Sequence, residues 1–105
     1  MPYLTDSLTG RVVTESILTE GEASLVVTGG ACLTIYNNFI ITSKNGEARV
    51  ISTGDIVSDI EEDKARVVIK LKSGAKLIIS MDDASYNGPE AMQLTIPGES
   101  TIVWN

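Results

Sequence analysis

Apolar and polar residues alternate along much of the chain with a period of two residues. The clearest example is "VVIKLKSGAKLIISM", in which Val67, Ile69 and Leu71 occupy alternate positions. A period of two places successive side chains on opposite faces of a β-strand. The interruption at Ser73 and Gly74 predicts a two-residue hairpin turn, because glycine reaches positive φ angles without strain.

A second segment of the chain has the same form. The stretches "SLVVT" and "ACLTIY" are joined at Gly29 and Gly30, which are expected to supply the tight turn. Both hairpins are expected to present one apolar row to a shared core. These rows are Leu25, Val27, Leu33 and Ile35 in the first hairpin, and Ile69, Leu71, Leu77 and Ile79 in the second.

The two hairpins belong to a longer internal repeat. Residues 9–36 align with residues 53–80 without a gap at an offset of 44, and seven of the 28 positions are identical. The heptad "TGRVVTE", which begins at Thr9, recurs as "TGDIVSD", which begins at Thr53. Two explanations account for this match. One is an internal duplication, and the other is the sequence pattern that β-hairpins have in common. We expect the two segments to fold alike and to be related by an approximate two-fold axis.

Each repeat continues into a further hairpin. Asn45 and Gly46 mark its turn in the first repeat, and Pro97 and Gly98 mark it in the second. The offset between the repeats has grown to 52 at these turns. We therefore place an eight-residue insertion within "DDASYNGPE", residues 82–90.

The pattern predicts a single all-β domain that covers residues 1–105. Each repeat is expected to form a meander of about five short strands, over about residues 8–52 and 53–104. Such a meander has an apolar face to bury, and the equivalent face of the other repeat can cover it. We therefore expect a pseudo-two-fold β-sandwich or a flattened barrel. At most one short helical turn is expected, near residues 88–92, where Pro89 suits a first helical position.

Composition bears on location and partners. The apolar runs are far shorter than the roughly 20 residues that a membrane-spanning helix needs. The first residues lack the basic start of a secretory signal, and the single cysteine, Cys32, excludes an internal disulfide. We expect a cytoplasmic protein. Its net charge of −6 argues against binding to nucleic acid or to an anionic membrane, and it suits a basic protein partner.

The chain contains no histidine. Histidine is the commonest general base near neutral pH and the commonest transition-metal ligand, so histidine-based catalytic triads and zinc sites are excluded. We expect no metal and no cofactor. Cys32 is predicted to be a half-buried, inert thiol, because a catalytic thiol would need a histidine beside it. Chemistry based on carboxylates, lysine or tyrosine remains open.

The insertion is a candidate recognition loop, because binding residues often lie on loops between strands. Its polar and aromatic residues are Asp82, Asp83, Ser85, Tyr86, Asn87 and Glu90. A solvated surface loop is one alternative. A calcium-like site of oxygen ligands is another, but the acids do not follow the Asp-x-Asp-x-Asn-Gly spacing of such sites. The acidic run "DIEEDK", residues 59–64, is interpreted as a charged hairpin tip.

Two surfaces are candidate interfaces. One is the face of the first hairpin that points away from the core, which is less polar than the same face of the second hairpin. The other is the final strand, "STIVWN", which has no lysine or proline to protect its edge. The residues concerned are Val26, Thr34 and Tyr36 on the face, and Ile102, Val103 and Trp104 in the strand. We expect a homodimer through one of these surfaces, although Trp104 also suits a place in the core.

The last third of the chain, "SGAKLIISMDDASYNGPEAMQLTIPGESTIVWN", resembles the tails of small β-rich bacterial proteins of unassigned function. Some such small acidic proteins are similar to toxin-neutralising immunity proteins, so the resemblance implies a binding role and brings no catalytic residues with it. We interpret the chain as a non-enzymatic protein-interaction module. The alternatives are a hydrolase or lyase that uses the carboxylates and Tyr86 of the loop 82–90, and a structural or assembly subunit.

Overall fold

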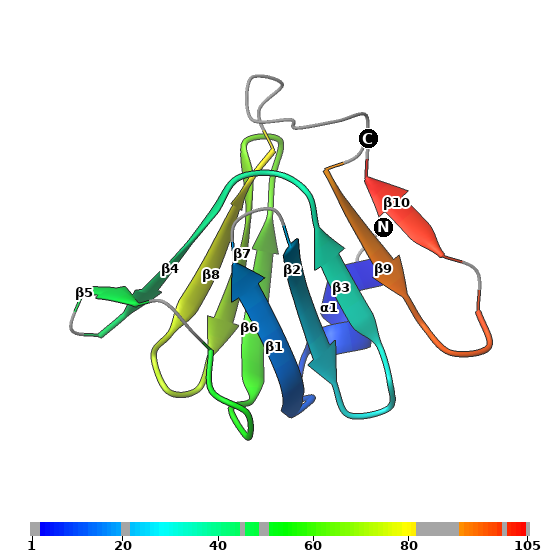
Figure 1. Ribbon diagram of the computed structural model, residues 1–105, viewed down its shortest axis with the longest axis horizontal. Helices are drawn as coiled ribbons and strands as arrows, with labels where there is room; N and C mark the ends of the chain where they lie inside the picture. Colours follow the sequence, from blue (N-terminus) through cyan, green and yellow to red (C-terminus); the bar gives the residue numbers. More distant parts are fainter. Residues whose placement is uncertain are drawn as a thin grey trace.

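The computed structural model describes residues 3–19, 22–44, 46–48, 51–81, 91–99 and 101–104. These residues form one short helix and ten strands, which confirms the all-β prediction (Figure 1). The elements are α1 (Tyr3–Leu8), β1 (Val13–Thr19), β2 (Glu22–Val27), β3 (Cys32–Ile35), β4 (Phe39–Ser43), β5 (Gly46–Ala48), β6 (Val57–Glu62), β7 (Arg66–Leu71), β8 (Lys76–Ser80), β9 (Met92–Thr95) and β10 (Ile102–Trp104).

The strands form two antiparallel sheets that pack face to face. The first sheet has the order β1-β2-β3-β9-β10, and the second has the order β5-β4-β8-β7-β6. All eight apolar residues expected to face the core are buried and belong to one cluster between the sheets. The chain is therefore a β-sandwich, in which alternation along each strand separates a buried face from an outer face.

Each sheet combines three strands of one repeat with two strands of the other. All five strands of a repeat were expected to lie in one meander, and the structure differs here. β3 does not continue into β4 but pairs with β9, so that Leu33 lies opposite Leu94. In the second sheet β4 pairs with β8, so that Ile41 lies opposite Leu77. The last hairpin of each repeat is thus exchanged onto the sheet of the other repeat.

The repeated heptads lie where the two repeats cross. Val12 and Ile56, which are equivalent in the repeat, form an isolated antiparallel bridge. The N–H of Gly10 donates to the Val57 carbonyl at 2.7 Å, and the N–H of Gly54 donates to the Val13 carbonyl at 2.8 Å. Equivalent residues therefore make reciprocal contacts, which is the relation expected about an approximate two-fold axis.

The hairpin turns of the two repeats are also alike, but each contains three residues rather than the predicted two. Val27 accepts from Gly30 and donates to the Ala31 carbonyl, with Gly30 at a φ of 88°. A side chain at Gly30 would meet the ring of Pro97, since an added Cβ would lie 2.8 Å from the Pro97 Cγ. The tip of the exchanged hairpin β9–β10 therefore packs closely on this turn.

The helix α1 was not predicted. Leu4 and Leu8, four residues apart on one side of the helix, are fully buried in the core cluster. The helix contacts β6, the edge strand of the second sheet. A six-residue helix is too short to show a helical period in the sequence. The turn expected near residues 88–92 lies mostly outside the described residues, and Met92 begins β9.

Candidate interaction face

The outer face of the first sheet carries an uncharged row that crosses all five strands. The strand register sets the row in the order Ile17, Ser24, Thr34, Gln93 and Val103. The two apolar ends of the row are exposed, Ile17 by 39% and Val103 by 38%. We call this set the central row. Because it holds no charged side chain, it can be covered without burying a charge.

A neighbouring row on the same face has one acidic end. The register sets Glu15, Val26, Cys32 and Thr95 side by side across β1, β2, β3 and β9. Tyr36, which follows the buried Ile35 directly after β3, is 41% exposed. Among the described residues of these rows, there is no lysine and no arginine. These two rows and Tyr36 thus offer aliphatic, aromatic, hydroxyl and amide groups, with the carboxylate of Glu15 at the β1 margin, and Glu22 belongs to the next row.

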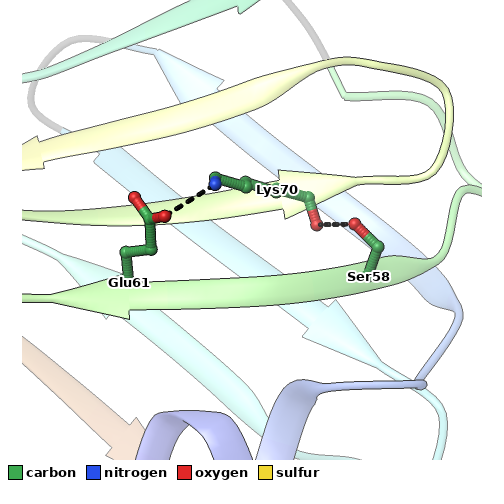
Figure 2. Close-up of polar contacts among 3 residues, drawn as sticks. All are labelled: Ser58, Glu61 and Lys70. Carbon is green, nitrogen blue, oxygen red and sulfur yellow. Dashed lines mark hydrogen bonds and ion pairs between the residues drawn. The ribbon is translucent and has the colours of Figure 1, made fainter.

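The second sheet has an ion pair where the first sheet has two apolar side chains. Lys70 Nζ donates to Glu61 Oε1 at 2.7 Å, as Figure 2 shows. In the first repeat the equivalent positions are Val26 for Lys70 and Ile17 for Glu61, because the offset of 44 holds along both strands. The hydrogen bond and the positive charge of Lys70 lower the pKa of Glu61, and the same contact raises the pKa of Lys70.

The backbone around these positions is the same in both sheets. Each repeat has a bulge at the start of its first strand, after Val13 in β1 and after Val57 in β6. At the first bulge the Thr14 hydroxyl donates to the Val26 carbonyl at 3.2 Å. At the second bulge the Ser58 hydroxyl donates to the Lys70 carbonyl at 3.1 Å (Figure 2). The apolar pair of the first sheet is therefore a difference in side chains on a matched scaffold.

The outer face of the second sheet is more strongly charged. Its row across β6, β7, β8 and β4 is Glu61, Val68, Ile78 and Ile40, so the charge of this row lies at its β6 end, and Ile40 at the other end is 57% exposed. The adjacent row includes Lys70 and Lys76, which lie directly opposite each other. The two outer faces of the sandwich thus differ, and three of the four large exposed apolar residues among the described residues lie on the first sheet.

The predicted interface residues divide into two groups. Val26, Thr34 and Val103 lie on the outer face of the first sheet, and Tyr36 continues it. Ile102 and Trp104 alternate with Val103, face inwards and pack against the core. The Trp104 Nε1 donates to Glu62 Oε2 at 3.2 Å, which joins the edge strands of the two sheets.

The outer face of the first hairpin and the final strand were expected to be separate surfaces. The exchange of hairpins places both of them on one sheet. β10 joins the sheet of β1, β2 and β3, so Val103 lies in one row with Thr34. Ile17, Ser24 and Gln93, the other members of this row, were not singled out from the sequence. The contrast of Ile17 with Glu61 in the aligned repeats was a signal that could have identified the first of them.

The remaining predicted sites can be located only in part. Asp82, Asp83, Ser85, Tyr86, Asn87 and Glu90 of the candidate recognition loop lie outside the described residues. Cys32 is half-buried, as expected, and lies on the outer face of the first sheet. Within the described ranges, no group of three Cys, Asp or Glu side chains is placed to hold a metal ion.

A polar depression lies at one end of the sandwich. It has a volume of about 770 Å³ and is lined by α1, the β2–β3 turn and the β9–β10 hairpin, with Asp6, Arg11 and Glu99 as its charged residues. Arg11 donates to the Thr28 carbonyl at 3.4 Å. In the second repeat the equivalent residue, Asp55, instead accepts from the hydroxyl of Ser73 at 2.5 Å. The lining combines charges of both signs with the apolar side chains of Ala31, Ile96 and Ile102, so it does not select one class of ligand.

Comparisons with protein-family models, with curated proteins and with solved structures found no protein similar to this chain. In the part of the chain that the structure describes, no helix is long and apolar enough to cross a membrane.

Proposed function

We propose that the protein is a non-enzymatic, cytoplasmic interaction module that binds another protein chain through the outer face of the first sheet. One observation carries the proposal. Ile17 and Val26 occupy the positions at which the second sheet has the ion pair of Glu61 and Lys70. The matched backbone makes the second sheet an internal reference for these two positions, since the ion pair there is partly exposed to solvent.

The two outer faces differ in how favourably their side chains interact with water. An exposed ion pair interacts favourably with water and adds little to stability. Exposed aliphatic side chains gain about 25 cal/mol for each Å² that is removed from water, so a partner that covers Ile17, Val26 and Val103 is favoured. Hydroxyl and amide groups of Thr34 and Gln93 can pair with polar groups of the partner. An apolar centre with polar neighbours is the usual composition of a protein interface.

The resemblance of the C-terminal third to small β-rich bacterial proteins agrees with a binding role, and an immunity-like function is one form that this role could take. The proposal does not depend on that resemblance, because the asymmetry between the two outer faces is a property of the chain itself.

A pair of photo-crosslinking variants tests the proposal. A photoreactive phenylalanine analogue is placed at Ile17 on the first face or at Ile40 on the second, and the protein is irradiated in cells that produce it naturally. We expect covalent adducts from position 17 and few from position 40, although Ile40 is the more exposed residue. Equal yields from both positions, or no adduct from position 17, would contradict the proposal.

A further inference from the structure

Three exposed lysines gather around the β7–β8 turn of the second sheet. Lys72 directly follows β7, and Lys76 begins β8. Lys44 follows β4, which pairs with β8, and its side chain lies over the turn. A Cβ added at Gly74 would lie 2.5 Å from the Lys44 Cγ and 2.7 Å from its Cε, so the glycine leaves the space that this side chain occupies. We call Lys44, Lys72 and Lys76 the lysine cluster.

The positions of the lysine cluster carry no charge in the first repeat. Their counterparts are Pro97, Thr28 and Cys32. The last two follow from the offset of 44, and Pro97 is the counterpart of Lys44 because each lies over the equivalent glycine of its turn. The two turns have the same backbone hydrogen bonds, so this backbone does not require lysines. The positive charge is a property of the side chains at one turn alone.

The carboxylates near the turn are engaged elsewhere. Glu61 forms the ion pair with Lys70, and Asp59 lies opposite Lys70 in the register. Asp55 accepts hydrogen bonds from the N–H and the hydroxyl of Ser73. Within the described ranges, no carboxylate forms an ion pair with a member of the lysine cluster. Three like charges at one turn repel one another, and a negatively charged partner relieves this repulsion.

We propose that the lysine cluster binds a short acidic segment of another protein chain. This inference goes beyond the proposed function, because it assigns a second surface, on the other sheet, to a partner of its own. Charge complementarity supports it, since the carboxylates of such a segment supply the counter-charges that these lysines lack. Each exposed charge pair contributes little, so several carboxylates must bind at once.

The backbone of the turn favours carboxylates over a phosphate group. Phosphate sites commonly combine cations with free backbone N–H groups. The N–H groups of Lys72, Ser73, Gly74 and Ala75 all donate to acceptors of the chain itself. Only ammonium groups are left for a ligand, and a flexible acidic segment can adjust its side chains to them.

The net charge of −6 limits the length of the segment. Charges further apart than the Debye length, about 10 Å at 0.1 M salt, are largely screened, so the nearest lysines dominate for a short ligand. A duplex of nucleic acid would extend over the neighbouring strand β6, which carries Asp59 and Glu61, and would be repelled there. A short segment avoids that strand.

An amide-proton NMR titration tests the proposal. The probe is a peptide with a run of glutamates between glycine and serine flanks, and the control peptide has glutamines in their place. We expect the glutamate peptide to shift the amide signals of the β7–β8 turn and the glutamine peptide to leave them unchanged. Lys72→Gln and Lys76→Gln should each raise the dissociation constant about threefold, since each removes one exposed charge pair. Binding should be lost at about 1 M salt.

Lys64→Gln is the matched control. Lys64 is exposed between β6 and β7, at the other end of β7, and its replacement changes the net charge by the same amount. It should leave the dissociation constant unchanged. An equal weakening by Lys64→Gln would mean that binding follows net charge and not the lysine cluster, and this would overturn the inference. A titration that shifts no signal of the turn would overturn it as well.

Two further probes identify the class of anion. They are tripolyphosphate and a short DNA duplex, each titrated at the same ionic strength as the peptide. Tighter binding of either probe than of the glutamate peptide at the turn would overturn the proposal in favour of a phosphate ligand.

The test is independent of the proposed function. Adducts from position 17 report on the first sheet and do not depend on the lysine cluster. The control position of that experiment, Ile40, pairs with Ile78, on the side of Lys76 that points away from the turn. Failure of peptide binding with adducts at position 17 would refute this inference alone, and peptide binding without those adducts would refute the proposed function alone.

Discussion

Val12 and Ile56 pair with each other directly before the edge strands β1 and β6, although they are equivalent residues of two repeats. The repeated heptads that contain them are therefore not two copies of one local motif in separate places. They join the first strands of the two repeats through reciprocal backbone hydrogen bonds, while the last hairpin of each repeat lies in the sheet of the other. The repeats thus cannot be separated without breaking both sheets.

This relationship predicts the behaviour of the two halves of the chain. Residues 1–52 and 53–105, produced separately, should not fold as monomers, because each would have to leave the β3–β9 and β4–β8 pairings unmade. When mixed, they should associate one to one and recover the native spectrum. The measurement is amide-proton NMR of each half and of the mixture. A half that gives a dispersed spectrum at monomeric mass would contradict the exchanged topology.

The contact of Gly30 with Pro97 predicts a difference between two glycine substitutions. Gly30 and Gly98 both have positive φ angles, 88° and 80°, so Gly→Ala at either position should cost about 1–2 kcal/mol of unfolding free energy. Gly30→Ala should cost more, since its Cβ would meet the Pro97 ring, whereas Gly98→Ala has no atom within 4 Å.

Chemical denaturation of both variants measures the difference, and the background variant Pro97→Ala identifies its source. In that background the excess cost of Gly30→Ala should largely disappear, because the Cγ atom that it meets has been removed. An excess that persists would mean that the exchanged hairpin does not press on this turn.

Much of the fold could be predicted from the sequence, since alternation identified the hairpins and their buried rows. The exchange could not be predicted, because the connection between β3 and β4 is as short as a hairpin turn. Long-range contacts set the direction of the β3–β4 connection. The N–H groups of Tyr36 and Asn37 both donate to the carbonyl of Ala91, which is distant in the sequence. The central row depends on the same exchange, since Gln93 and Val103 join it from the other repeat.

The ion pair of the second sheet predicts a local pH effect. Lys70 lowers the pKa of Glu61 below the ordinary value of a glutamate side chain, so the interaction stabilises the fold at higher pH and is lost as the pH falls through the folded-state pKa. In Lys70→Met, the pKa of Glu61 should rise towards the ordinary value. NMR titration of side-chain carboxyl groups measures this directly.

Asp63 is the internal control for that titration. Its pKa is lowered by hydrogen bonds from the backbone N–H groups of Arg66 and Ala65, at 2.9 and 2.7 Å, and not by Lys70. It should stay low in Lys70→Met. If the pKa values of both carboxyl groups rose together, the variant would have disturbed the hairpin β6–β7 as a whole.

The substitution Asn37→Asp is expected to cause the strongest pH-dependent change in the free energy of unfolding. Its side chain is 98% buried, Nδ2 donates to the Ser80 carbonyl at 2.8 Å, and Oδ1 has no hydrogen-bond partner. Asn37→Asp keeps the shape but, when ionised, cannot donate to Ser80 and buries a charge. We expect a loss of about 3 kcal/mol of unfolding free energy at neutral pH.

The deficit of Asn37→Asp should shrink as the pH falls. Burial raises the folded-state pKa of such a carboxyl above its unfolded value of about 3.9, so the folded state takes up a proton first and the protonated group can donate to Ser80. Asn38→Asp, at an exposed neighbouring position, should show little loss and no such recovery. Denaturant unfolding of both variants between neutral and acidic pH makes the comparison. A deficit that is independent of pH would mean that the new carboxyl reaches water, and that Asn37 is not held in the closed environment described above.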